Sequence, residues 1–285
     1  MQVKWNIKIK MTNEKPKSLD WLAEKEYLGR GFLIGQTPQY QSVAVYFVTG
    51  RQPSSRARKF ELDGDAIKTT PTDPEVLKTG NPALLLYDAI RRVRTRGDQL
   101  VVSNGAQTDL IANHIPSCSP SMGYYSYVEF LANAFNGPHF VQGVDVTAFE
   151  PDPPNNTPRI SGIMGHHSGA IAICKYNGTV ESDFQFFEFP LRPGEGRFIS
   201  TYTGQNVPKG VAIPSFEGEP VRMQMPGKTP EEIAENFYRA LGPKKKGPGI
   251  ISPNEDFRVG VVVAIKPSKG EDLMESYIIN RCGLK

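Results

Sequence analysis

Three arginines and two serines lie together on a short stretch of the chain, GRQPSSRAR (50–58), which directly follows an apolar run. Guanidinium groups bind phosphate through paired hydrogen bonds, and serine hydroxyls add further donors. The stretch therefore suits an anionic ligand, although a solvated basic turn has the same composition. Its polar members are Arg51, Ser54, Ser55, Arg56 and Arg58.

A second polar stretch, SNGAQTD (103–109), also follows an apolar run. Gly105 tolerates a positive φ, so the backbone here can approach a ligand closely and offer its N–H groups to an anion. The alternative is an ordinary turn that leads into a helix capped by Thr108 or Asp109. The spacing fits both interpretations equally well.

Two further loops carry side chains that could bind a ligand or take part in a reaction. Glu150 begins a proline-rich segment that ends in NNTPRI (155–160), and stiff loops hold functional groups in place. PKKKGPG (243–249) presents three lysines that suit a phosphate or a developing oxyanion. Taken alone, the first is equally typical of a surface loop with a solvated carboxylate, and the second of a flexible charged loop.

Other reactive side chains do not form a recognisable site. His166 and His167 are adjacent, so on a strand they face opposite sides, and no third metal ligand accompanies them. Cys118 has no base partner nearby, and Cys174 lies in an apolar run, so both are expected to be structural. The dinucleotide, P-loop and α/β-hydrolase motifs are missing, which argues against those classes.

The bulk composition predicts a globular protein of the cell interior. The chain has 285 residues, of which 39% are hydrophobic, and a net charge of +3. That charge is too small for a nucleic-acid-binding protein but permits an anionic small ligand. Three scattered cysteines, no apolar run of membrane length and no signal peptide favour the cytoplasm.

Hydrophobic patterns predict an α+β fold with largely antiparallel sheets in one domain spanning 1–285, with residues 1–20 as a possible extension. Residues 3–9 alternate as in an edge strand, unless the biological start is Met11. The clearest helix is 229–242, with Thr229 as N-cap and Glu232 completing a capping box. A helix over 121–135 is expected to pack between layers. Strands are expected over 31–35, 43–48, 84–93, 100–104, 159–164, 170–176, 184–189, 257–265 and 276–279. The first two are expected to form a hairpin. A turn at Gly97-Asp98 joins 84–93 to 100–104 and favours a strand over 84–93, although its spacing also fits a helix.

These stretches in their order resemble the archaeal-type IMP cyclohydrolase family. The resemblance covers about residues 27 to 202. No single matching stretch is specific to the family, but six stretches in a fixed order are specific. They are YLGRGFLIG (27–35), AVYFVTGRQPSSRAR (44–58), NPALLLYDAIR (81–91), VVSNGAQTD (101–109), NTPRI (156–160) and FISTY (198–202).

The resemblance implies an Ntn-hydrolase-like αββα sandwich of two antiparallel sheets flanked by helices, without the usual N-terminal nucleophile. It also implies ring closure of 5-formamidoimidazole-4-carboxamide ribonucleotide (FAICAR) to IMP with loss of water. A poor amide nucleophile must be held in attack geometry while charge on the formyl oxygen is stabilised. The resemblance implies no metal, cofactor, nucleic acid or membrane, and it implies a homo-oligomer.

The same resemblance implies which residues act. Arg56 would polarise the formyl oxygen or hold the carboxamide, and Tyr87 would donate to the developing oxyanion or shuttle a proton. Glu150 would orient the carboxamide NH₂ or act as base. A C-terminal lysine joins them, among Lys244, Lys245 and Lys246, of which we take Lys246. Substrate binding is expected from Arg30, Ser54, Ser55, Ser103, Asn104, Gly105, Thr108, Asp109, Asn156 and Arg159.

Two competing functions remain open at this level. The first is a non-catalytic relative that binds purine nucleotides. The second is an Ntn-type amidohydrolase that acts on a different amide, which would need a nucleophilic serine or cysteine at a processed N-terminus. We expect the cyclohydrolase, and the absence of a plausible N-terminal nucleophile in the sequence disfavours the amidohydrolase.

Overall fold

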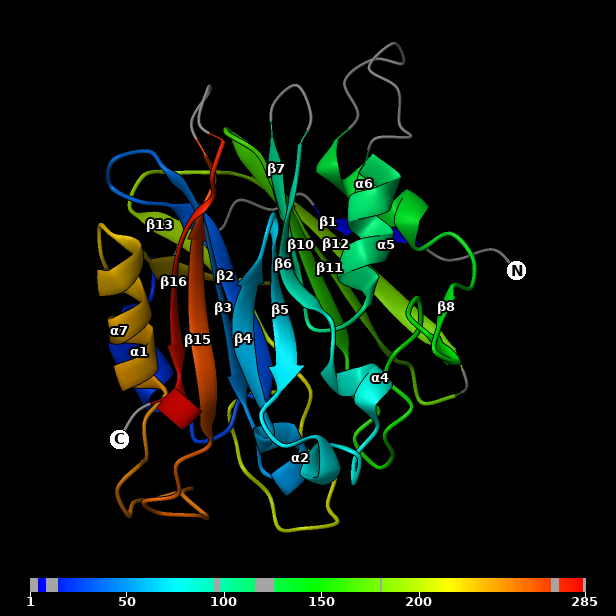
Figure 1. The fold of residues 1–285 in the computed structure, drawn as a ribbon, viewed down its shortest axis with the longest axis vertical. Helices are drawn as coiled ribbons and strands as arrows, with labels where there is room; N and C mark the ends of the chain where they lie inside the picture. Colours follow the sequence, from blue (N-terminus) through cyan, green and yellow to red (C-terminus); the bar gives the residue numbers. More distant parts are fainter. Residues whose placement is uncertain are drawn as a thin grey trace.

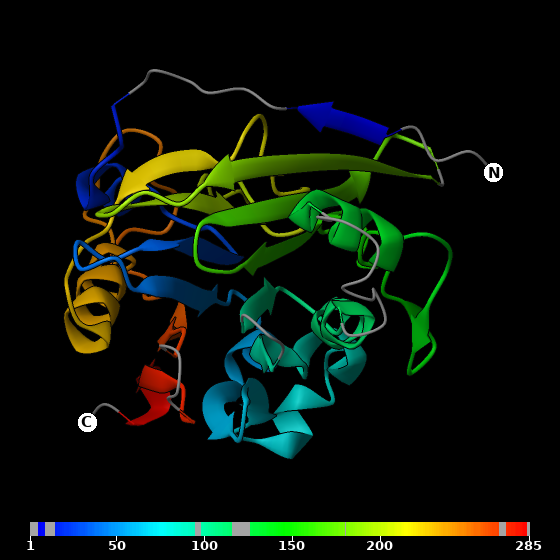
Figure 2. The ribbon, with the colours of Figure 1, turned by 90° about the horizontal axis from the view of Figure 1, so that it is seen from above.

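The structure, a computed structural model, describes residues 5–8, 15–94, 98–115, 126–179, 181–267 and 272–283. Two large sheets pack face to face, and helices cover their outer faces (Figures 1 and 2). In Figure 2 the gold helix on one side and the green helices on the other enclose both sheets. Within these ranges, no helix is long and apolar enough to cross a membrane.

The larger sheet has eight strands in the order β1-β12-β11-β10-β7-β6-β5-β4. Its neighbours are antiparallel except β1, which lies parallel to β12 at one edge. This confirms the expected N-terminal edge strand. The bounds are β1 Trp5–Lys8, β4 Arg58–Asp63, β5 Ala66–Pro71, β6 Asp88–Val93, β7 Gln99–Ser103, β10 Arg159–Met164, β11 Ser168–Tyr176 and β12 Ser182–Pro190.

The smaller sheet has six antiparallel strands in the order β14-β13-β2-β3-β15-β16. The expected hairpin of the first two apolar runs is present as β2 and β3. The bounds are β2 Arg30–Gln36, β3 Ser42–Thr49, β13 Glu195–Ser200, β14 Val221–Gln224, β15 Arg258–Ile265 and β16 Glu275–Asn280. A separate two-stranded ribbon joins β8 Phe140–Val141 to β9 Val144–Asp145.

Helices α1 and α7 cover the smaller sheet, and α5 and α6 cover the larger one (Figure 1). Short helices α2, α3 and α4 lie in the connections around β4 to β6. The bounds are α1 Leu19–Ala23, α2 Pro53–Arg56, α3 Pro74–Leu77, α4 Pro82–Leu85, α5 Gln107–His114, α6 Tyr127–Ala134 and α7 Pro230–Ala240, with a final 3₁₀ turn Arg281–Gly283.

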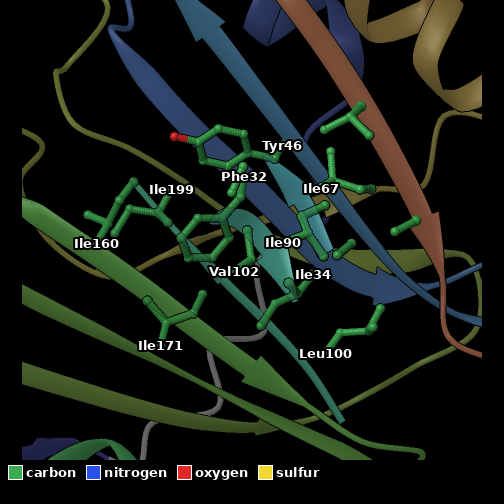
Figure 3. Packing of buried hydrophobic residues seen from close by; sticks show 14 of the residues in the cluster. Phe32, Ile34, Tyr46, Ile67, Ile90, Leu100, Val102, Ile160, Ile171 and Ile199 are labelled. Atoms are coloured by element: carbon green, nitrogen blue, oxygen red, sulfur yellow. The ribbon is translucent and has the colours of Figure 1, made fainter. Parts of the chain in front are cut away.

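Strands β2 and β3 are buried along their whole length because both of their faces meet a core. Phe32 and Tyr46 point into the core between the sheets, which Figure 3 shows from close by. Leu33 and Phe47 point into a second core beneath α7. A strand buried on both faces carries a continuous apolar run rather than an alternating one, which explains its sequence pattern.

Helix α7 confirms the clearest helix prediction, with one difference at its start. Thr229 is the N-cap and accepts a hydrogen bond from the Glu232 N–H at 3.2 Å. The Glu232 carboxylate does not return to Thr229. It accepts from the N–H of Lys228 at 2.8 Å instead, so the predicted capping box is half formed.

Two other predicted elements differ from the structure. The strand expected over 84–93 begins only at Asp88, because Asn81 caps a helical turn that starts at Pro82 and continues to Leu85. Helix α6 begins at Tyr127 and covers the outer face of the larger sheet instead of packing between layers. Residues 121–125 of that predicted helix, Cys118 and Gly97 lie outside the described residues.

A buried carboxylate at the start of β6 makes stability depend on pH. Burial, with the neighbouring Asp109 carboxylate, raises the pKa of Asp88 to about 6. Since an unfolded aspartate titrates near about 3.9, the folded state loses stability as pH rises between these values. We expect Asp88→Asn to stabilise the protein by about 1 kcal/mol at about pH 7 and little at about pH 4.

Thermal melts at the two pH values measure this difference. Asp183→Asn is the control, because Asp183 is exposed on β12. A gain that is equal at both pH values would contradict a burial-driven shift at Asp88.

Candidate functional site

A pocket of about 320 Å³ opens at the end of the sandwich where α2 and α4 lie (Figure 1). At this end β2, β4, β6 and β10 begin while β3 and β7 end, so residues distant in sequence meet. The charged residues of the lining are three arginines and two acids. They are Arg30, Arg51, Arg58, Glu150 and Asp152.

Glu150 lies between two arginines in the pocket wall. Its Oε2 is 2.6 Å from Nη2 of Arg30, and its Oε1 is 3.4 Å from Nη1 of Arg159. All three side chains are at least nine-tenths buried. Burial opposes the charge of Arg30, but the Glu150 carboxylate outweighs this effect, so the pKa of Arg30 lies well above its ordinary value. The two guanidiniums thus offset the cost of burying the Glu150 carboxylate.

The proline-rich loop that carries Glu150 is closed by its own hydrogen bonds. The N–H of Glu150 donates to the Thr157 carbonyl at 2.9 Å, and Asp152 accepts from both the N–H and the hydroxyl of Thr157. Thr157 also shares a 2.7 Å hydrogen bond with the Tyr202 hydroxyl. The expectation that this loop is rigid and places Glu150 therefore has a local structural basis.

Two tyrosines and an arginine form a second polar group, which reaches the pocket through the arginine. The hydroxyls of Tyr46 and Tyr87 are 2.9 Å apart, and Nη1 of Arg58 lies 3.4 Å from Tyr87 Oη. Arg58 is held by the carbonyls of Ser55 and Leu85. Arg58 lines the pocket directly, whereas Tyr87 lies beside it and retains 6% exposure.

Arg51 is placed at the pocket mouth by two loops from the C-terminal half. Its Nη1 donates to Asn206 Oδ1 at 3.0 Å and to the Val207 carbonyl at 2.9 Å, and its guanidinium lies over the Tyr27 ring. Buried Glu26 fastens the other loop, because its carboxylate accepts from the N–H groups of Ile251 and Ser252 at 2.9 and 2.6 Å.

The pocket has an excess of positive charge. Arg30 is matched by Glu150, but Arg51 and Arg58 form hydrogen bonds only to carbonyl, amide and hydroxyl oxygens among the described residues. A buried guanidinium without an anionic partner is costly, and binding of an anion removes that cost. This end of the sandwich is therefore suited to an anionic ligand.

The side chains of the basic loop 50–58 point to two different places in the structure. Ser54 and Ser55 line the pocket with Arg51 and Arg58. Arg56 is not part of this lining. It donates from Nε to the Gly50 carbonyl and from Nη2 to Glu255 at 2.6 Å, and it lies over the Phe257 ring.

Residues 103–105 and Thr108 are buried beneath the pocket and are absent from its described lining. Asn104 uses its side chain within the protein, where it donates to the Pro158 carbonyl and accepts from the Ile160 N–H. A side chain on Gly105 would come within 2.6 Å of Arg159, so this glycine makes room for the arginine. Helix α5 begins at Gln107, so the predicted caps Thr108 and Asp109 lie inside it.

The remaining predicted residues lie at the edge of this site or away from it. Asp109 forms an ion pair with Arg91 at 2.5 Å, and Asn156 adopts a positive φ outside the lining. Lys246 is exposed, whereas Lys244 lines a separate hollow of about 350 Å³ behind α7. Burial lowers the pKa of Lys244 to about 8, and its Nζ donates to the Ala240 carbonyl.

The discounted side chains have structural roles or lie outside the site. Among the described residues, no group of three or more His, Cys, Asp and Glu side chains could hold a metal ion. His166 Nε2 is 2.8 Å from Lys266 Nζ. Burial raises the pKa of the Cys174 thiol to about 12, so this cysteine is protonated and a poor nucleophile.

Sequence reasoning did not assign Tyr46, Tyr27 or Tyr202 to the site. Each lies within an apolar or strand-like run, where a tyrosine resembles any other core residue. The only sequence signal that could have assigned them to the site is the hydroxyl group, since a buried phenol requires a polar partner. The sequence does not show which partner that is.

The sequence is similar to a known protein family and to several archaeal proteins. The profile of the IMP cyclohydrolase-like protein family matches residues 27–247. IMP cyclohydrolase of Haloquadratum walsbyi is 32% identical over 74% of this chain and 83% of its own length. Those of Methanococcus maripaludis strain C7 and Methanocaldococcus jannaschii are 26% and 25% identical over 73% of this chain, and over 86% and 84% of their own lengths. The chain belongs to the IMP cyclohydrolase-like protein family.

Proposed function

We propose that this protein is an IMP cyclohydrolase that closes FAICAR to IMP with loss of water. The observation that carries the proposal is that one pocket holds a buried carboxylate, Glu150, together with two guanidiniums, Arg51 and Arg58, that have no anionic partner among the described residues. A nucleotide with a phosphate at one end and a carboxamide at the other is complementary to this distribution of charge. The names of the archaeal relatives support the same activity.

In this proposal the anionic end of the substrate binds at Arg51, near the hydroxyls of Ser54 and Ser55. This differs from the sequence-based expectation, which gave the phosphate to Arg30 and the 103–105 corner. Arg30 is already paired with Glu150, and residues 103–105 are buried behind it. Arg51 lies at the pocket mouth and is half-buried, so it can release its carbonyl partners to bind phosphate oxygens.

The reacting groups then lie toward Glu150 and Tyr87. The carboxamide nitrogen attacks the formyl carbon and loses one proton, and a tetrahedral hydroxyl adduct forms. The C–O bond of the adduct then breaks as the former formamido nitrogen loses its proton to form the C=N bond of the purine ring, so the oxygen leaves as water with the two protons that the nitrogens released. Glu150 accepts a hydrogen bond from the carboxamide NH₂, which orients the nitrogen lone pair and receives the proton as the bond forms. Tyr87 and Arg58 donate to the formyl oxygen, first as it becomes an oxyanion and then as it leaves as water.

We further propose that the layers found here are those of the Ntn-hydrolase fold, that the chain is a single domain, and that it works as a homo-oligomer. The helix, sheet, sheet, helix order supports the first point. A core that takes residues from Phe32 to Met274 and from both sheets supports the second. Sedimentation of the purified protein tests the third.

A direct assay tests the proposed activity. Purified protein treated with a chelator is mixed with FAICAR, and the ultraviolet change on IMP formation is followed. We expect turnover far above the uncatalysed rate, and we expect the chelator to leave it unchanged. Tight binding of IMP without turnover would indicate a nucleotide-binding relative, and neither turnover nor binding would leave only the fold in common.

A further inference from the structure

The Tyr46 hydroxyl is a polar group at the margin of the main core. Tyr46 is fully buried on β3, and in Figure 3 its oxygen points out of the cluster of aliphatic side chains that surrounds its ring. Among the residues that the structure describes, its hydroxyl has one hydrogen-bond partner, Tyr87 Oη at 2.9 Å. A purely structural core position would be filled equally well by phenylalanine, so this hydroxyl calls for an explanation.

The direction of that hydrogen bond follows from the available donors and acceptors. Each phenol has one hydrogen to donate and can accept from more than one donor. Arg58 can only donate, so it uses the oxygen of Tyr87 as acceptor. If Tyr87 donated to Tyr46, the Tyr46 hydrogen would be buried without an acceptor, which is unfavourable. Tyr46 therefore donates to Tyr87, and the Tyr87 oxygen accepts from both neighbours.

This arrangement leaves the hydrogen of Tyr87 free for a third group. We propose that Tyr46 is a positioning residue for the ring closure, which holds Tyr87 as the hydrogen-bond donor to the formyl oxygen of the substrate. The proposal rests on the proposed function, because it gives Tyr46 a role in that reaction. It goes beyond that function by assigning a task to a buried strand residue that does not line the pocket.

The charges around the pair favour the same assignment. Arg30 from β2 and Arg58 from β4 are the charged groups that face the two phenols. Burial, with the nearby Tyr87, raises the pKa of Tyr46 well above its ordinary value, so Tyr46 keeps its hydrogen throughout the working pH range. Tyr87, whose hydrogen is used by neither Tyr46 nor Arg58, is then the phenol that can donate to the departing oxygen.

The test compares Tyr46→Phe with two other tyrosine-to-phenylalanine variants. Tyr87→Phe defines the loss when the donor itself is removed, and Tyr127→Phe on α6 is the control for removing a partly buried hydroxyl far from the pocket. We expect Tyr46→Phe to lower kcat about 10-fold, less than the ~10²–10³-fold expected for a direct donor, with KM unchanged. An unchanged KM beside a lowered kcat distinguishes positioning of the donor from loss of substrate binding.

The double variant separates this role from a structural one. In a Tyr87→Phe background, Tyr46→Phe should cause no further loss of kcat, because its effect acts through Tyr87. The proposal fails if Tyr46→Phe keeps the wild-type kcat while Tyr87→Phe loses activity. It also fails if the two losses multiply. A wild-type protein that does not turn over FAICAR would instead overturn the proposed function, and this role with it.

Discussion

Glu150→Gln should reduce kcat by about 10²–10⁴-fold, the range typical of a lost acid–base group. Glutamine keeps the shape of glutamate but cannot receive the proton that leaves the carboxamide nitrogen. It also leaves the guanidiniums of Arg30 and Arg159 without their shared carboxylate. Because breaking a buried ion pair costs about 3–5 kcal/mol, we expect a lower melting temperature as well.

The control for this variant is Glu255→Gln. Glu255 forms a salt bridge with Arg56, but its side chain is 44% exposed, and exposed pairs contribute about 0–1 kcal/mol. Turnover and melting temperature should both stay close to wild type. Assays at a temperature where both variants are folded separate lost chemistry from lost structure. Full turnover by folded Glu150→Gln would show that Glu150 takes no part in the reaction and only holds Arg30 in place.

The secondary structure was predictable where one local signal dominated. The apolar runs that became β2, β3, β10 and β15 carry enough hydrophobic residues to be buried on both faces, so their pattern specifies strands. Failures occurred where local capping competed with hydrophobic pattern, as at Asn81-Pro82, where a cap starts a helical turn that includes the first two residues of the strand predicted over 84–93. The position of α6 was also wrong, because the sheets pack directly on each other and leave only their outer faces for helices.

The site was predictable as a set of loops but not as a set of contacts. Glu150, Tyr87, Arg30 and Arg159 do come together, and all of them were named from the sequence. Which arginines of loop 50–58 face the pocket depends on the single turn of α2, which directs Arg56 toward Glu255. No spacing rule in the sequence distinguishes three arginines on so short a segment.

The segment Ser103-Asn104-Gly105 shows that an exposed ligand-binding loop and a buried turn can have the same local sequence. A Ser-Asn-Gly corner after a strand is typical of anion sites, but here Asn104 satisfies backbone groups of the neighbouring strand. Gly105 is needed for the close approach of Arg159, not of a ligand. The difference lies in a contact with β10, more than fifty residues away in the chain, which local reasoning does not include.

Arg51→Ala should lower kcat/KM for FAICAR by about 10²-fold, mainly through KM. A charge-assisted hydrogen bond contributes about 1.5–3 kcal/mol, and Arg51 has no carboxylate partner among the described residues to compete with a bound phosphate. Because its present partners are carbonyl and amide oxygens on a surface loop, its removal should change the melting temperature little. Steady-state kinetics and a thermal melt measure both effects.

Arg56→Ala is the matched comparison, because it removes the same side chain from the same loop five residues away. Arg56 points to Glu255 and Phe257 outside the pocket, so we expect kcat/KM to stay within about threefold of wild type, a difference smaller than 1 kcal/mol. The opposite result, a large loss at Arg56 with normal kinetics at Arg51, would mean that the loop rearranges when substrate binds. The family resemblance would then identify the acting arginine correctly, and the geometry of the pocket would not.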